Sequence, residues 1–247
     1  MFQESALSTV KLPSTLKRIE CRAFCDCNNL ESVDLPEGLE CIGKQCFKHT
    51  ALKSVRFPYA LKVVAEGAFY WCESLTSAEF SEGLETIGVC AFAETRLRSV
   101  VFPASLRSVS QGAFAQCSKL KTVRFSAGLE VLGADVYTES GDPYAGVFQG
   151  SAVKRVQLPS TLKGIEYNAF CKCTGLKAIQ LPAGLVAIGK SCFQGSDLRK
   201  LALPASVREI GEGAFSECDK LRAVSVEDGC TVDVKSRVGR GVLVERK

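Results

Sequence analysis

The sequence has very little histidine, methionine or tryptophan, with one residue of each among 247. The only histidine, His49, is not placed to pair with a nucleophile. Neither a G-x-S-x-G motif nor a Walker phosphate-binding motif is present. The carboxylates are scattered over variable positions. We therefore predict a protein that is not an enzyme and that carries no cofactor.

Long apolar segments are also missing. No run approaches the roughly 18 apolar residues of a membrane span, so we expect no membrane insertion. The first residues, MFQESALSTVKLP, lack the basic and apolar regions of a signal peptide. With Met1 as the native start, this favours a cytoplasmic protein; the alternative is a cell-surface or secreted one. A net charge of +4 is too small to indicate nucleic-acid binding.

What the sequence does contain is a repeat, which must be found before a fold is assigned. Odd units read F-x-x-C-x-x-L and even units read F-x-x-[TS]-x-[LV], so the true unit is a pair of about 45 residues. Even units place glycine after isoleucine or leucine, at Gly43, Gly88, Gly133 and Gly189, where we expect a positive φ. The phenylalanines recur every 22 or 23 residues, with one interval of 34, at Phe24, Phe47, Phe69, Phe92, Phe114, Phe148, Phe170, Phe193 and Phe215.

Each unit also carries a strand pattern, L-x-x-V-x-L. In the second unit Val33 and Leu35 point to one side and Asp34 points to the other. Ten such strands run from Leu7–Leu12 to Leu221–Val226, and seven are followed at once by proline, which ends a strand. The return arm is too short for more than a turn or two of helix. Because one unit cannot bury its apolar side alone, the pattern predicts a stacked solenoid.

The pattern LPxxLxxIGxxAFxxCxxLxxVxLP, which covers about residues 7–226, resembles the BspA-like (Treponema-type) leucine-rich repeat. The resemblance implies an α/β fold: a right-handed solenoid with a parallel sheet on one face and short helical turns or irregular return arms. It also implies adhesion and protein binding, often at the surface of microbes and protists. The predicted domains are a solenoid over 1–226, with an insertion at about 134–146, and a C-terminal cap hairpin or tail over 227–247.

The thirteen cysteines suggest a rival function, a metal-binding or redox thiol protein. Cys27 and Cys173, however, occupy a core position of the repeat. Repeat cysteines recur only in alternate units, about 9–10 Å apart, which exceeds the roughly 7 Å reach of a disulfide between Cα atoms. We predict reduced, structural thiols and no metal site, with Cys25 and Cys171 as the most exposed of them.

Two rows of side chains on the strands are candidate binding residues. The outward column varies in type on a constant frame, as in repeat proteins that bind partners; its candidates are Asp34, Arg56, Glu79, Arg124, Gln157 and Gln180. The basic row indicates a partner that is an acidic protein, a glycan or a phosphate-bearing surface; alternatively, it only keeps the face solvated. Its members are Lys53, Arg98, Lys121, Lys154, Lys177 and Arg199, continued by Arg222.

Two further candidates lie in loops: Tyr137 and Tyr144 in the insertion, and Trp71 after Phe69. Insertions in solenoids map to loops and can carry function, and exposed aromatics can be interface hot spots. We predict a monomeric, non-enzymatic protein–protein interaction module that uses the strand face or the insertion. The alternatives are a cell-surface adhesin fragment that binds host matrix or glycan, and a regulatory module of a larger enzyme.

Overall fold

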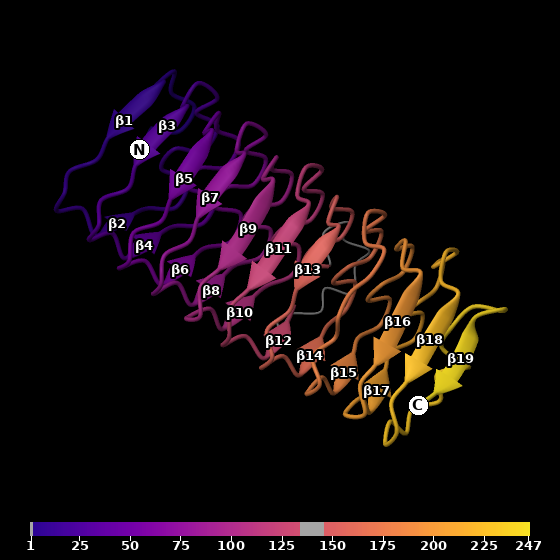
Figure 1. The fold of residues 1–247 in the computed structure, drawn as a ribbon. Coiled ribbons are helices and arrows are strands. Elements are labelled where there is room, and N and C mark those ends of the chain that lie inside the picture. Colours follow the sequence, from indigo (N-terminus) through magenta and orange to yellow (C-terminus); the bar gives the residue numbers. More distant parts are fainter. Residues whose placement is uncertain (1, 134–145) are drawn as a thin grey trace.

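The computed structural model describes residues 2–133 and 146–247. The chain winds into a rod whose two ends carry the two termini (Figure 1). Each turn of the winding, here called a rung, places equivalent residues of neighbouring repeats opposite each other. Val10 pairs with Val33, for example, and Val123 pairs with Val156. All strand pairs are parallel, as expected when each rung returns to the same side before the next strand.

One side of the rod, the strand face, is formed by the longer strands. Residues 227–247 return the chain to this face, where the last strand pairs in parallel with the one before it. The strands are β1 (Thr9–Lys11), β3 (Ser32–Asp34), β5 (Ser54–Arg56), β7 (Ser77–Glu79), β9 (Ser99–Phe102), β11 (Thr122–Phe125), β13 (Arg155–Gln157), β16 (Lys200–Leu203), β18 (Ala223–Val226) and β19 (Leu243–Arg246). Six of these strands, β1, β3, β5, β9, β13 and β16, end just before a proline, which removes a ladder donor.

A second side is formed by two-residue strands in the return arms. They form one five-stranded and one four-stranded sheet, which follow each other along the rod. Each contributes one buried aliphatic residue to the interior. They are β2 (Arg18–Ile19), β4 (Cys41–Ile42), β6 (Val63–Val64), β8 (Thr86–Ile87), β10 (Ser108–Val109), β12 (Val131–Leu132), β14 (Gly164–Ile165), β15 (Ala187–Ile188) and β17 (Glu209–Ile210).

The expectation of an α/β fold was wrong, because the described residues contain no helix. On the third side of the rod the backbone donates to the next rung and not to its own carbonyls four residues earlier. Phe24 N, for example, donates to Cys46 O at 2.9 Å. Arg22 and Asp26 on either side have φ values of 57° and 59°, which no helix contains. The return arms are therefore turns and short strands of a β-solenoid.

Stacked phenylalanine rings form the centre of the rod. Ten rings follow one another with centroids 5.2–5.8 Å apart. All except the first are buried. That first ring is Phe2, which stacks on Phe24 at 5.5 Å. Phe2, Ser5 and Leu7 thus form an even unit, one more than the sequence pattern identified.

The alternation of odd and even units follows from a hydrogen-bonded contact between rungs, in which a hydroxyl of an even unit and a thiol of the next odd unit share one carbonyl. Thr50 Oγ1 donates to Phe47 O at 3.0 Å, and Cys72 Sγ of the next rung donates to the same carbonyl at 3.0 Å. The hydroxyl and the thiol are themselves 3.3 Å apart. The other pairs are Ser5–Cys27, Thr95–Cys117, Ser151–Cys173 and Ser196–Cys218.

The glycines of the even units serve close packing more than turn geometry. Only Gly133 has the expected positive φ, at 93°. A Cβ on Gly43 would lie 2.4 Å from Cys21 N, and one on Gly88 would lie 2.7 Å from Glu66 N. Glycine is therefore required there because the backbone of the neighbouring rung approaches too closely for any side chain.

Candidate binding surface

The structure brings the outward column together on the strand face. Its six residues are exposed, and the register places Arg56 opposite Glu79 and Arg124 opposite Gln157. The residue before each of them along its strand points inward, which is the alternation that the pleat imposes. The column therefore presents acidic, basic and amide side chains along one face of the rod.

The basic row lies beside this column and is positioned by backbone hydrogen bonds between rungs. Lys121 N donates to Arg98 O at 3.0 Å, and Lys154 N donates to Lys121 O at 3.0 Å. Lys53 forms an ion pair with Glu31. Across the described residues, the row from Arg98 to Arg222 has no carboxylate within ion-pair distance.

The strand face is not the single ten-stranded sheet that we expected. Regular strand pairing stops between β3 and β5, between β7 and β9, and on both sides of residues 178–180. Single backbone hydrogen bonds still cross these places before the strands, such as Lys53 N to Glu31 O at 3.2 Å. Residues 178–180 are the expected eighth strand but do not form one. We call these three interruptions seams. Each 22-residue step between neighbouring strand positions falls at a seam, so the shorter even-unit connection was a sequence signal for them, although the 23-residue step from Arg155 to Ala178 is interrupted as well.

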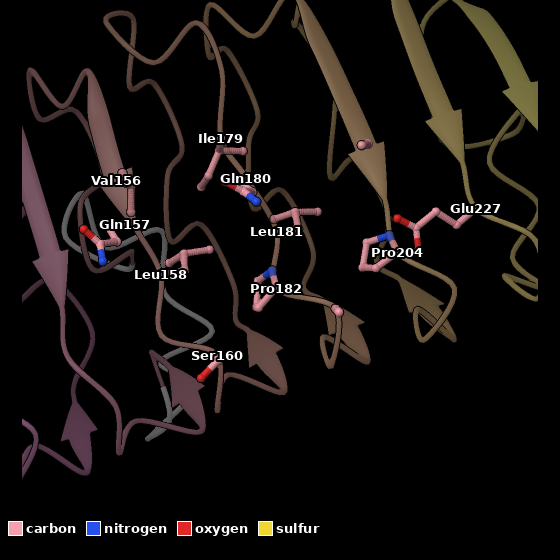
Figure 2. A pocket seen from close by; sticks show the side chains of 12 residues that line it. Val156, Gln157, Leu158, Ser160, Ile179, Gln180, Leu181, Pro182, Pro204 and Glu227 are labelled. Atoms are coloured by element: carbon pink, nitrogen blue, oxygen red, sulfur yellow. The ribbon is translucent and has the colours of Figure 1, made fainter. Parts of the chain in front are cut away.

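Each seam opens a groove on the strand face. The largest, of about 730 Å³, surrounds residues 178–180. Figure 2 shows Gln157 and Leu158 on one side of it, Pro204 on the other, and Gln180 in the middle. A groove of about 400 Å³ lies at the seam between β7 and β9 and is lined by Glu79. A groove of about 270 Å³ lies at the seam between β3 and β5 and is lined by Asp34 and Arg56. Outward-column side chains thus line all three grooves, which sequence reasoning missed.

Trp71 belongs to a separate cluster on the turn side of the rod. Its indole is 40% exposed and stacks on Tyr70 at 5.4 Å. His49 lies 5.6 Å from Trp71, and its Nδ1 is 3.1 Å from Asp26 Oδ1. The hydrogen bond from Cys25 lowers the pKa of the Asp26 carboxyl. Trp71 is therefore not part of the strand face, and Tyr137 and Tyr144 lie outside the described residues.

The thiols are arranged for packing. None of the thirteen cysteines, all within the described residues, forms a disulfide. Burial raises the pKa of Cys72 to about 11 and that of Cys117 to about 12, so neither is a thiolate near neutral pH. In the described ranges, no group of three or more His, Cys, Asp or Glu side chains is placed to hold a metal ion.

The exposure expected for Cys25 and Cys171 was wrong, because they are only 3% and 4% exposed. The exposed cysteine is Cys21, while Cys41 and Cys90 are partly exposed. The repeat pattern could not show this, since all five stand outside its constant positions.

Thiol labelling gives a direct test of this arrangement. In the native protein we expect a thiol-reactive dye to label Cys21 fastest and the ten buried cysteines only after unfolding. Cys21→Ser should remove the fast phase and leave the slower ones unchanged. Rapid native-state labelling of Cys25 or Cys171, located by peptide mapping, would contradict the structure.

A helix-free solenoid with an exposed, grooved strand face is the architecture of a repeat binding protein. A family model described as a BspA type leucine-rich repeat region matches residues 1–121 and 144–236, in six copies. The chain belongs to this family, which consists generally of non-enzymatic binding proteins. In the described residues, no helix is long and apolar enough to cross a membrane.

Solved structures show the same fold. A leucine-rich repeat protein from Bacteroides ovatus is 20% identical, with 98% of this chain and 84% of that chain covered and a TM-score of 0.51. The pneumococcal vaccine antigen PcpA is 20% identical, with coverages of 97% and 79% and a TM-score of 0.54. A leucine rich cell surface protein from Faecalibacterium prausnitzii is 21% identical, with coverages of 98% and 80% and a TM-score of 0.50. No protein with a curated description matches the chain.

Proposed function

We propose that this protein is a non-enzymatic binding module that holds a partner protein against its strand face. The observation that carries the proposal is the placement of the varied outward column along the edges of three grooves. Varied side chains on a constant solenoid frame are how repeat proteins present a binding surface. The grooves add concave relief, which lets a partner bury more surface than a flat sheet would.

The N-terminal part of the face supports a protein partner by its charges. Asp34, Arg56 and Glu79 alternate in sign over neighbouring rungs. Arg56 and Glu37 are 3.7 Å apart, but both side chains are more than two-thirds exposed, so their pairing contributes little to folding. These groups are available for complementary contacts, which favour one partner over others. A surface location is a second proposal, supported by the cell-surface protein of similar fold.

The test compares two variants of the whole chain in capture experiments from the source cells and from their surroundings. The strand-face variant changes Arg56, Arg124, Gln157 and Gln180 to glutamate. The control variant changes Lys17, Lys62 and Lys190, which lie on exposed ion pairs away from the strand face, to glutamate. Both lower the net charge by the same amount.

We expect a partner protein that the wild type and the control variant retain and that the strand-face variant loses. Thermal unfolding of the three proteins should agree, because all the substituted side chains are exposed. Retention of the same partner by the strand-face variant would exclude this face. Loss from both variants would show a nonspecific response to charge.

A further inference from the structure

The two halves of the strand face differ completely in charge. On each rung we count the charges of four residues: the basic-row position and the three that follow it. In the first four rungs these residues include three cations and three carboxylates. In the next six rungs they include nine cations and no carboxylate, over 98–101, 121–124, 154–157, 177–180, 199–202 and 222–225. Because the whole chain carries only +4, the remaining residues are net negative.

The cations of this second part, here called the basic half, form a row along the rod. Arg98, Lys121, Lys154, Lys177, Arg199 and Arg222 are all exposed. They occupy consecutive rungs, which at about 4.8 Å per rung extend over about 24 Å. Near one end a cleft of about 400 Å³ lies between Arg199, Lys200, Lys220 and Arg222. Of these four, only Lys220 has a carboxylate partner in the described chain, Asp197.

The basic half also contains hydrogen-bonding groups that are not charged. The largest groove interrupts it at residues 178–180, where the amides of Gln157 and Gln180 line the space (Figure 2). An amide both donates and accepts hydrogen bonds, so it can bind a hydroxyl group in either direction. The surface thus offers regularly spaced charges together with groups suited to hydroxyls.

The surface lacks what the competing partners require. A protein contact would need anchors from outside this half, because protein interfaces are anchored by aromatic and large apolar residues and Val101, at 57% exposure, is the only large apolar residue exposed on the described basic half. Single-stranded nucleic acids are held by stacking on aromatic side chains, and this half has none on its outer surface. The phosphates of a duplex follow a helical path, so a row along the rod meets few of them.

From these observations we infer that the basic half binds a linear sulfated polysaccharide along the axis of the rod. Such a chain carries sulfate groups at regular intervals for the cations and hydroxyl groups for the two glutamines. This binding shares Arg124, Gln157 and Gln180 with the proposed protein contact, but it is carried by the basic row. The strand positions of these rungs hold no carboxylate to repel the chain; Glu227, which lines the largest groove, accepts a hydrogen bond from Ala205 N. Because the contacts are exposed ion pairs, affinity will fall as salt rises.

The test measures the affinity of the whole protein for heparin chains at several salt concentrations. The basic-half variant changes Lys121, Lys154, Lys177 and Arg199 to alanine. The control variant changes Lys17, Lys44, Lys62 and Lys190 to alanine, which removes the same number of exposed cations elsewhere. We expect the basic-half variant to lose about tenfold or more in affinity and to show a shallower salt dependence, with the control near wild type.

Two further measurements decide the ligand class. Chemically desulfated heparin, which keeps only its carboxylates, should bind at least about tenfold more weakly, because the sulfate contacts are lost. Gln157→Ala with Gln180→Ala should weaken heparin binding but leave binding to polyglutamate unchanged. The inference is overturned if the basic-half variant binds heparin like the wild type, or if polyglutamate or duplex DNA of equal length binds as tightly as heparin. Gln157 and Gln180 also belong to the strand-face variant, but Lys121, Lys154, Lys177 and Arg199 do not. Heparin binding by the basic-half variant therefore tests this inference independently of the captured protein partner.

Discussion

Phe170→Ala is expected to lower the free energy of unfolding by about 3–5 kcal/mol, the cost of removing a buried phenylalanine and leaving a cavity. The Phe170 ring is fully buried and stacks on Phe148 at 5.4 Å and on Phe193 at 5.5 Å. Its loss interrupts the stack in the middle of the rod, where neither neighbouring rung can move to fill the space. Urea unfolding followed by circular dichroism measures the change.

Gln180→Ala is the matched control for this substitution. Gln180 lies ten residues later on the strand face and its side chain is exposed. Its replacement should change stability by less than about 0.5 kcal/mol. Equal destabilisation by the two substitutions would refute the assignment of which side chains point inward. A second unfolding transition in the Phe170 variant would show that the rungs on either side unfold separately, as neighbour-coupled repeats can.

Stability is expected to fall steeply above pH 9. Burial raises the pKa of Cys72 to about 11, and that of Cys117 and Cys173 to about 12, from an ordinary 9.0. The folded state therefore keeps protons that the unfolded state releases. The contribution is fully present below pH 9 and is lost as pH rises toward 11–12. Each thiol contributes about 1.4 kcal/mol per pH unit, so the three together give about 4 kcal/mol per unit.

Urea unfolding at pH 7, 9, 10 and 10.5 measures this loss. Lysine and tyrosine also titrate in the range, so the comparison needs a variant without one thiol. Cys72→Thr provides it, because threonine occupies the same place in even units, as Thr50 and Thr95 do. Above pH 9 its stability should fall less steeply than that of the wild type, by about 1.4 kcal/mol per pH unit. Parallel pH profiles would show that Cys72 is not a protonated core thiol.

The regular spacing of phenylalanine and the L-x-x-V-x-L pattern were sufficient to predict the solenoid and the residues that point outward. These features repeat in every rung, so local pattern and global packing agree. The absence of helices was not predicted, because it depends on hydrogen bonds between rungs that no single unit contains. The position of Phe2 was missed because only part of its repeat is present in the sequence.

The candidate surface was predicted in position but not in shape. The outward column follows directly from strand alternation, whereas the basic row follows from the repeat, because its residues stand immediately before the strands. The grooves follow from where pairing stops. All three 22-residue steps, such as Ser32 to Ser54, fall at these places, but so does the 23-residue step from Arg155 to Ala178, so connection length accounts for only part of the pattern. The change of charge along the face was present in the sequence, and the structure shows that these residues lie together on one exposed face.

The contact between an even-unit hydroxyl and an odd-unit thiol limits how the rod can change in length during evolution. A duplication or deletion of one rung would set two thiols or two hydroxyls beside each other and lose the shared carbonyl contact seen at Phe47. A duplication of two rungs, about 45 residues, keeps every contact and every connection length. Relatives of this protein should therefore differ in length by pairs of rungs, each of which adds a further 22- and 23-residue step to the binding surface.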